Sequence, residues 1–151
     1  MLAILRAAAV VWLLSGAAAH AESTRAILQD FGFFGLWSPE CDLAVQPDNL
    51  LRETSIEPSG QVKFTETFGK DYQPQVYVVL AARRAGPDIL VLRIELNGTI
   101  RQELTIVRET GRLRTTTNRR LSDGKYVVKD GVVLSINKET PWLVKCGLMR
   151  R

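Results

Sequence analysis

Residues 75–107 read QVYVVLAARRAGPDILVLRIELNGTIRQELTIV, and this stretch determines the fold class. Apolar side chains recur at every second position, as in the run Leu90, Leu92, Ile94 and Leu96. Such alternation is typical of half-buried β-strands. Gly86-Pro87 and Asn97-Gly98 interrupt it, and Asn-Gly supplies the positive φ angles that tight hairpin turns require. The stretch therefore predicts antiparallel strands joined by short hairpins.

The same pattern extends along the chain on both sides of this stretch. Turn dipeptides recur at short intervals, at Ser59-Gly60, Thr110-Gly111, Asp123-Gly124 and Asp130-Gly131. No helical pattern of 10–15 residues separates the strands, which argues against a parallel sheet. The sequence thus predicts a mostly β protein, an antiparallel meander of about eight to ten strands. Closing the meander into a small barrel hides both sheet edges, whereas a sandwich or an open curved sheet hides them only partly.

Residues 1–21 have the features of a secretory signal peptide. Arg6 provides a positive charge, residues 7–18 are apolar, and Ala19-His20-Ala21 forms a small-x-small cleavage site. The alternative is a membrane anchor, but a run of about a dozen residues is short for a span that needs about 20. We expect cleavage after Ala21, a periplasmic or secreted protein, and no stable membrane insertion.

The segment from residue 22 to residue 33 is predicted to be a short helix that leads into the main domain. Ser23 or Thr24 is suited to cap it, and Gly32 is suited to end it. Its apolar side is formed by Ile27, Leu28 and Phe31. We interpret the segment as a lid or plug packed on a single barrel-like domain of residues 34–151, with a partner-binding arm as the alternative.

The histidine content limits the chemistry. His20 is the only histidine, so residues 22–151 contain none. Ser-His-Asp and Cys-His catalysis and histidine-containing zinc sites are excluded there, and two cysteines cannot form a four-cysteine zinc site. The sixteen carboxylates are scattered, and no pair stands out as glycosidase-like. We expect no enzyme activity, no cofactor and no metal.

Cys41 and Cys146 lie near the two ends of residues 22–151. An oxidising compartment favours a disulfide between them. Closing a loop of about 100 residues contributes about 4–5 kcal/mol in the chain-entropy model. The alternative, a reactive thiol, has no Cys-x-x-Cys motif to support it.

Two tryptophans are predicted to be structural aromatic plugs. Trp37 on the first strand is suited to close one end of a small barrel, because its side chain buries a large apolar surface. Trp142 and Cys146 would bring the last strand beside the first. The alternative is that the two rings are platforms for a ligand.

Gly35-Leu36-Trp37 resembles the Gly-x-Trp of the lipocalin (calycin) family, and also small bacterial metalloprotease inhibitors of barrel form. The wider pattern resembles uncharacterised exported proteins of alphaproteobacteria: Gly35, Trp37 and Cys41 early, then Lys129, Asp130, Gly131, Pro141, Trp142, Leu143, Lys145 and Cys146 late. These resemblances imply a calycin-like barrel and an exported location, and the exported proteins have no assigned activity.

Arginines cluster along residues 112–120. A positive patch is predicted from Arg101, Arg108, Arg112, Arg114 and Arg120, suited to an anionic ligand, a lipid headgroup or an acidic partner. The alternative is a solvated face whose charges pair with Glu103 and Glu109. Nucleic acid is not expected, because residues 22–151 carry 19 basic against 16 acidic side chains and the run lacks interleaved aromatic residues.

These observations favour an exported non-catalytic binding module, a lipocalin-like small barrel that holds an unknown small molecule or presents a basic face. A periplasmic protein–protein interaction module, such as a protease inhibitor that acts through the segment before Gly35, is the alternative. Because the inward positions are mostly Val, Leu and Ile, a filled interior is favoured over an open one.

Overall fold

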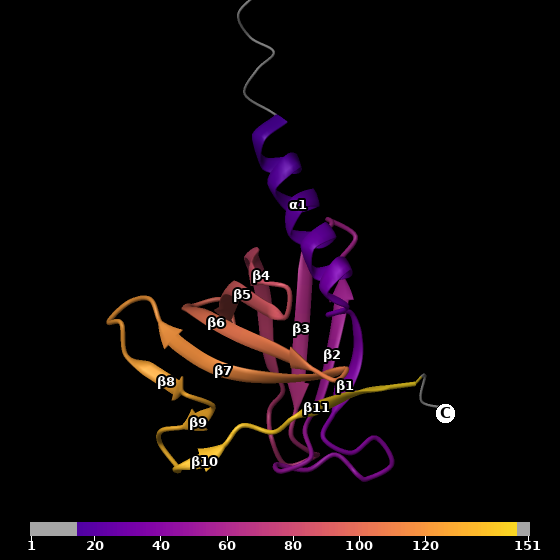
Figure 1. The fold of residues 1–151 in the computed structure, drawn as a ribbon, viewed down its shortest axis with the longest axis vertical. Coiled ribbons are helices and arrows are strands. Elements are labelled where there is room, and N and C mark those ends of the chain that lie inside the picture. Colours follow the sequence, from indigo (N-terminus) through magenta and orange to yellow (C-terminus); the bar gives the residue numbers. More distant parts are fainter. Residues whose placement is uncertain (1–14, 148–151) are drawn as a thin grey trace, which may run out of the picture.

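The structure is a computed structural model that describes the backbone of residues 15–147 and the side chains of residues 23–147. One helix, α1 (Ser15–Phe31), precedes the strands (Figure 1). The strands are β1 (Gly35–Ser38), β2 (Leu51–Ile56), β3 (Val62–Thr67), β4 (Gln75–Gly86), β5 (Ile89–Leu96), β6 (Ile100–Glu109), β7 (Arg112–Arg120), β8 (Tyr126–Lys129), β9 (Val132–Val133), β10 (Lys138–Glu139) and β11 (Leu143–Cys146).

Eight of these strands close into an antiparallel barrel. Each of β1 to β7 pairs with the next, and β11 lies between β7 and β1. The other three strands, β8 to β10, extend from the edge of β7 and project to one side in Figure 1. The predicted up-and-down barrel with an N-terminal helix is confirmed, and the alternatives of a sandwich or an open sheet are excluded.

The first and last strands meet at a seam that a disulfide fastens. Leu36 of β1 lies opposite Cys146 of β11. The Sγ atoms of Cys41 and Cys146 are 2.06 Å apart, and their Cα atoms are 5.5 Å apart. The predicted disulfide is confirmed. It closes a loop with a sequence separation of 105 residues, which corresponds to about 4–5 kcal/mol of stabilisation in the chain-entropy model.

Helix α1 is longer at its N-terminal end than predicted. Ser23 and Thr24 lie inside it and do not cap it, because the alanine-rich residues before them are strong helix formers and continue the helix. The predicted cut after Ala21 falls within α1, and residues 1–14 of the predicted signal peptide lie outside the described residues. Among the residues described, no helix is long and apolar enough to cross a bilayer.

The C-terminal end of α1 is where the sequence predicted it. Gly32 has a φ of +77°, which glycine adopts without steric cost. The Phe33 backbone N–H donates to the Leu28 carbonyl at 2.9 Å, and that of Gly32 to the Gln29 carbonyl at 3.0 Å. These two bonds form a Schellman motif. The turn directs the chain from the helix into β1.

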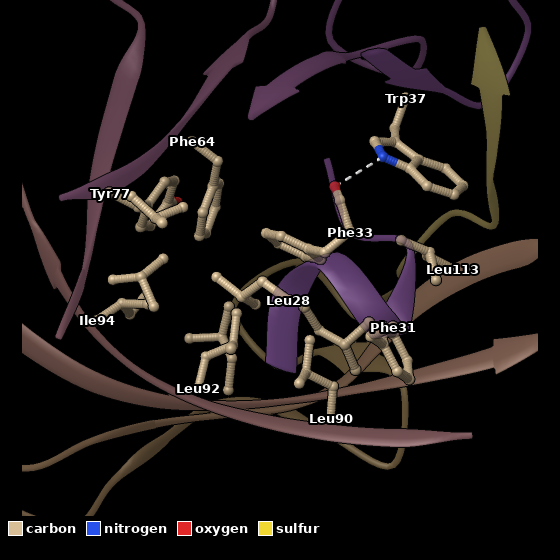
Figure 2. Close-up of a cluster of buried hydrophobic side chains, with 14 of the residues drawn as sticks. Leu28, Phe31, Phe33, Trp37, Phe64, Tyr77, Leu90, Leu92, Ile94 and Leu113 are labelled. Atoms are coloured by element: carbon tan, nitrogen blue, oxygen red, sulfur yellow. Dashed lines mark hydrogen bonds between the residues drawn. The ribbon is translucent and has the colours of Figure 1, made fainter. Parts of the chain in front are cut away.

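The end of α1 inserts its apolar side chains into the barrel. Leu28, Phe31 and Phe33 are completely or almost completely buried. They belong to one cluster with residues of β5, β6 and β7, which includes Leu90, Leu92, Ile106 and Leu113 (Figure 2). The helical segment is therefore a plug, and the free-arm alternative does not apply to these three side chains.

A β-bulge in β4 changes which side chains face the interior. The sequence placed Leu80 and Ala82 on one face of a regular strand. The register shifts between Val79 and Ala81, so that Leu80 is exposed whereas Ala82 packs against the core. A bulge adds one unpaired residue and reverses the alternation beyond it.

Candidate functional site

The barrel interior holds a cavity of about 260 Å³ at the end opposite α1. Arg84, near the end of β4, pairs with Asp30 of α1 at 2.7 Å. Gln75 and Tyr77, at the start of the same strand, line the cavity. We call the end that α1 plugs the filled half, and the end with the cavity the open half. The cavity is lined by Leu50, Arg52, Phe64, Glu66, Phe68, Gln75, Tyr77, Leu104, Thr115, Asn118, Val127, Val128, Val133, Thr140, Pro141 and Leu143.

The walls of the cavity are mostly apolar. Nine of its sixteen lining residues are Leu, Val, Phe or Pro. Phe64 separates the two halves: its ring meets Phe33 of the plug edge to face, with centroids 5.7 Å apart, and stacks on Tyr77 at 4.5 Å (Figure 2). The interior is therefore filled on one side of Phe64 and open on the other. The expectation of a filled interior is wrong for the open half.

A buried ion pair forms part of the cavity wall. Arg52 of β2 and Glu66 of β3 lie directly opposite each other in the sheet. Arg52 donates two hydrogen bonds to the same carboxylate oxygen, Oε1 of Glu66. The donor Nε lies 3.0 Å and the donor Nη2 lies 2.6 Å from that oxygen. Arg52 also stacks over Phe64, with Cζ 5.2 Å from the ring centroid. The third nitrogen, Nη1, is buried and has no hydrogen-bond partner among the described residues.

Tyr77 extends this polar group into a network. Its hydroxyl donates to Gln75 Oε1 at 2.5 Å and lies 3.4 Å from Glu66 Oε2. Burial raises the pKa of Tyr77 far above its ordinary value, and the negative charge of Glu66 raises it further. The phenol is therefore neutral at physiological pH. Among the residues that line the cavity, Arg52 is the one basic residue and Glu66 the one acidic residue.

Asn118 lines the cavity because of a second bulge, in β7. Thr105 pairs with Thr117 whereas the next residue, Ile106, pairs with Thr115, so Thr116 is the extra residue. Thr115 and Asn118 consequently both line the cavity, although regular alternation would place them on opposite faces of β7. Asn118 Nδ2 donates to Gln102 Oε1 at 3.3 Å, and Asn118 Oδ1 is buried without a partner in the described part of the chain.

Strands β8 to β10 form one wall of the cavity, and we call residues 126–139 the flap. Its Val127, Val128 and Val133 line the cavity. Arg114 of β7 holds the flap by donating from Nη2 to the Gly131 carbonyl at 2.9 Å. A Cβ atom at Gly131 would lie 2.7 Å from that same nitrogen, so the contact requires glycine. On the outer side of the flap Leu134 is exposed.

Each of the five arginines predicted to form an anion-binding patch has a carboxylate partner. Nitrogen-to-oxygen distances are 3.2 Å for Arg101–Glu95, 3.0 Å for Arg108–Asp88, 3.9 Å for Arg112–Glu109, 3.1 Å for Arg114–Glu139 and 2.7 Å for Arg120–Asp123. The alternative, a face of paired charges, is supported. Glu109 pairs with Arg112 as that alternative proposed. Glu103 pairs with Arg93 and Arg119, which are not among the five predicted arginines. None of the five predicted arginines lines the cavity.

The two tryptophans differ in their surroundings. Trp37 is buried, and its Nε1 donates to the Phe33 carbonyl at 3.0 Å, as a plug residue would. Trp142 is only half-buried, and its ring lies under the guanidinium groups of Arg112 and Arg114, at 4.9 and 5.6 Å. The prediction of a plug is wrong for Trp142 because its neighbour Leu143 takes the inward position.

Sequence reasoning missed the polar residues of the cavity. One signal was present: Glu66 continues the alternating face of Val62 and Phe64, so a carboxylate was due to face the interior. Nothing comparable marked Arg52. Within residues 23–147 no three His, Cys, Asp or Glu side chains are grouped so that they could hold a metal ion.

No family model matches the chain, and no curated protein or solved structure matches it either.

Proposed function

We propose that this chain is an exported, non-catalytic binding module that holds a small molecule in the open half of its barrel. The observation that carries the proposal is the cavity of about 260 Å³, with apolar walls and a few buried polar groups that converge on it. Ligand sites commonly combine these two features, and the mouths of β-barrels are a frequent location for them. The site is lipocalin-like in that an up-and-down barrel carries it in its interior.

The volume indicates the size of the ligand. An apolar cavity of about 150 Å³ accommodates benzene. Scaling from benzene, a cavity of about 260 Å³ suits a molecule of roughly ten non-hydrogen atoms. The proposed ligand is thus a compact molecule the size of a substituted benzene, smaller than most drug-sized ligands.

A binding role is favoured over catalysis by the state of the polar groups. Arg52 holds the Glu66 carboxylate with two hydrogen bonds, and Tyr77 is neutral. A general base must have a free lone pair aimed at a substrate and a pKa near the working pH. Tyr77 keeps its proton, and Oε1 of Glu66 is already occupied by Arg52.

Export is proposed from the disulfide, because disulfides persist mainly in oxidising compartments such as the periplasm or the extracellular space. The alternative role, a protein inhibitor that acts through residues 22–33, has less support. Leu28, Phe31 and Phe33 are buried in the barrel and are unavailable to a partner.

The test is an NMR titration of isotope-labelled protein with neutral benzyl compounds of about ten non-hydrogen atoms. We expect the resonances of Leu50, Leu104 and Leu143 to shift most. Val133→Phe, which places a large ring at the flap wall, should weaken binding at least about tenfold. Leu134→Phe adds the same ring on the exposed side of the flap and should leave binding unchanged.

The proposal is overturned if the compounds shift no cavity resonance, or if Val133→Phe and Leu134→Phe bind them equally well.

A further inference from the structure

We infer, as an extension that rests on the proposed binding function, that the cavity selects an electrically neutral ligand with one hydrogen-bond acceptor and one donor. A small carboxamide or lactam on an apolar body has this chemistry. Carboxylates and ammonium ions of the same shape should bind more weakly.

The first argument is the charge balance of the cavity wall. Arg52 and Glu66 line the cavity, and Nη2 of the arginine lies 2.6 Å from Oε1 of the glutamate. Their side chains are only 6% and 11% exposed, so little water screens any additional charge. A ligand that brings a net charge would leave it without a counter-charge in a poorly hydrated site, which is costly. The neutral pair therefore favours a neutral ligand.

Tyr77 is subject to the same burial and the same Glu66 charge. The burial and the Glu66 charge that raise its pKa disfavour a negative charge on its oxygen. A ligand carboxylate beside Tyr77 would be subject to the same desolvation and the same repulsion by Glu66. The cavity should therefore discriminate against anions in spite of its arginine.

The second argument comes from the unused hydrogen-bonding groups. Arg52 Nη1 is a buried donor and Asn118 Oδ1 is a buried acceptor, and neither has a partner among the described residues. Both residues line the cavity. A buried polar group without a partner costs about 1–3 kcal/mol. A carboxamide carries the two complementary groups, a carbonyl that can accept from Arg52 and an N–H that can donate to Asn118.

The experiment compares three probes that share a benzyl body: phenylacetamide, phenylacetate and phenethylammonium. Isothermal titration calorimetry at pH 7 measures their dissociation constants with the disulfide-bonded protein. We expect the amide to bind at least about tenfold more tightly than either ion. This comparison uses the unaltered protein, so it decides the inference even if a variant does not fold.

A charge-changing variant makes the test sharper. Glu66→Gln removes the negative charge but keeps an amide oxygen that can accept from Arg52. The cavity then has a net positive charge, so the affinity for phenylacetate should rise at least about tenfold relative to that for phenylacetamide. Glu103→Gln removes a carboxylate that pairs with Arg93 and Arg119 and does not line the cavity. It should leave the order of the three probes unchanged.

The outcomes separate the two proposals. Phenylacetate that binds the unaltered protein as tightly as phenylacetamide, or no gain for phenylacetate in folded Glu66→Gln, overturns the neutral-ligand inference and leaves the binding function standing. If none of the three probes shifts the NMR resonances of the cavity, both the inference and the binding function are contradicted.

Discussion

The two halves of the barrel are built from the same strands but have different interiors. In the filled half, Leu28, Phe31 and Phe33 enter from α1 and complete a close-packed apolar core. In the open half no segment of residues 15–147 enters, and a cavity of about 260 Å³ lies against the Arg52–Glu66 pair. The comparison shows that the strands of this barrel do not fill it by themselves. The plug supplies the missing volume at one end only.

Polar chemistry explains why the open half does not simply collapse. Arg52 and Glu66 occupy inward positions that elsewhere in the barrel carry mostly apolar side chains, and their network extends to Tyr77 and Gln75. Buried charges require partners with defined geometry, so these side chains cannot move freely into the remaining space. The open half is therefore held in place by hydrogen bonds as well as by packing.

The largest expected difference between the halves concerns two phenylalanines. Phe33→Ala removes a completely buried ring from the filled half and should lower the free energy of unfolding by about 3–5 kcal/mol. Phe68→Ala removes a half-buried ring that lines the cavity and should cost about 1 kcal/mol. Denaturant unfolding of both variants measures the two costs. Equal costs would mean that the halves are packed alike.

The ion pair gives the next largest effect. Glu66→Ala leaves the Arg52 charge buried without its partner, and we expect a loss of about 3 kcal/mol. The double variant Arg52→Met, Glu66→Leu removes both charges and should be more stable than Glu66→Ala, because well-packed apolar residues replace a buried pair at little or no cost. The same unfolding experiment compares them. A double variant that is less stable than Glu66→Ala would contradict this view of the pair.

Tyr77 predicts a pH dependence that originates in the open half. Its pKa is raised in the folded state, so the folded protein keeps the proton when the unfolded chain releases it above about pH 10. Tyr77 stabilises the fold fully well below that pH, and by pH 11 its contribution should have fallen by about 1.4 kcal/mol in total. Chemical unfolding from pH 8 to 11 should show this decline in the unaltered protein and a smaller one in Tyr77→Phe. Identical declines would show that Tyr77 ionises freely.

The smallest effect concerns the arginine that holds the end of the plug. Arg108 Nη1 donates to the Phe31 carbonyl at 2.9 Å, and its Cζ lies 4.8 Å from the Phe31 ring centroid. A cation near a helix C-terminus stabilises the helix. Arg108→Met should therefore lower the free energy of unfolding by about 0.5–1 kcal/mol, which is measured as a lower melting temperature. The control Arg101→Met breaks only an exposed pair with Glu95 and should have almost no effect. A larger loss for Arg101→Met would contradict the assigned roles.

Much of the barrel was predictable from the sequence, because its signals are local. The alternation in residues 75–107 and the glycine turns gave the meander, and Cys41 with Cys146 gave the closed seam. The plug was predictable from Leu28 and Phe31 on one helical side. These features depend on periods of 2.0 and 3.6 residues, which a single sequence displays.

The cavity was harder to predict because it depends on bulges and on pairs of distant residues. The bulge at Thr116 has no clear sequence signal, and it moves Asn118 to the interior. Arg52 and Glu66 meet only when β2 and β3 are in register. The ion pairs of the predicted arginine patch are partly local, as in Arg112 with Glu109 and Arg120 with Asp123. Only pairs such as Arg114 with Glu139 depend on residues far apart in the chain.

The most direct test of the two-halves account is a crystal structure of the protein under xenon pressure, because xenon enters dry apolar cavities and marks them. The account predicts xenon density among Leu50, Leu104 and Leu143, and none among Leu28, Phe31 and Leu90. Side chains occupying the first site, or xenon among the plug residues, would contradict it.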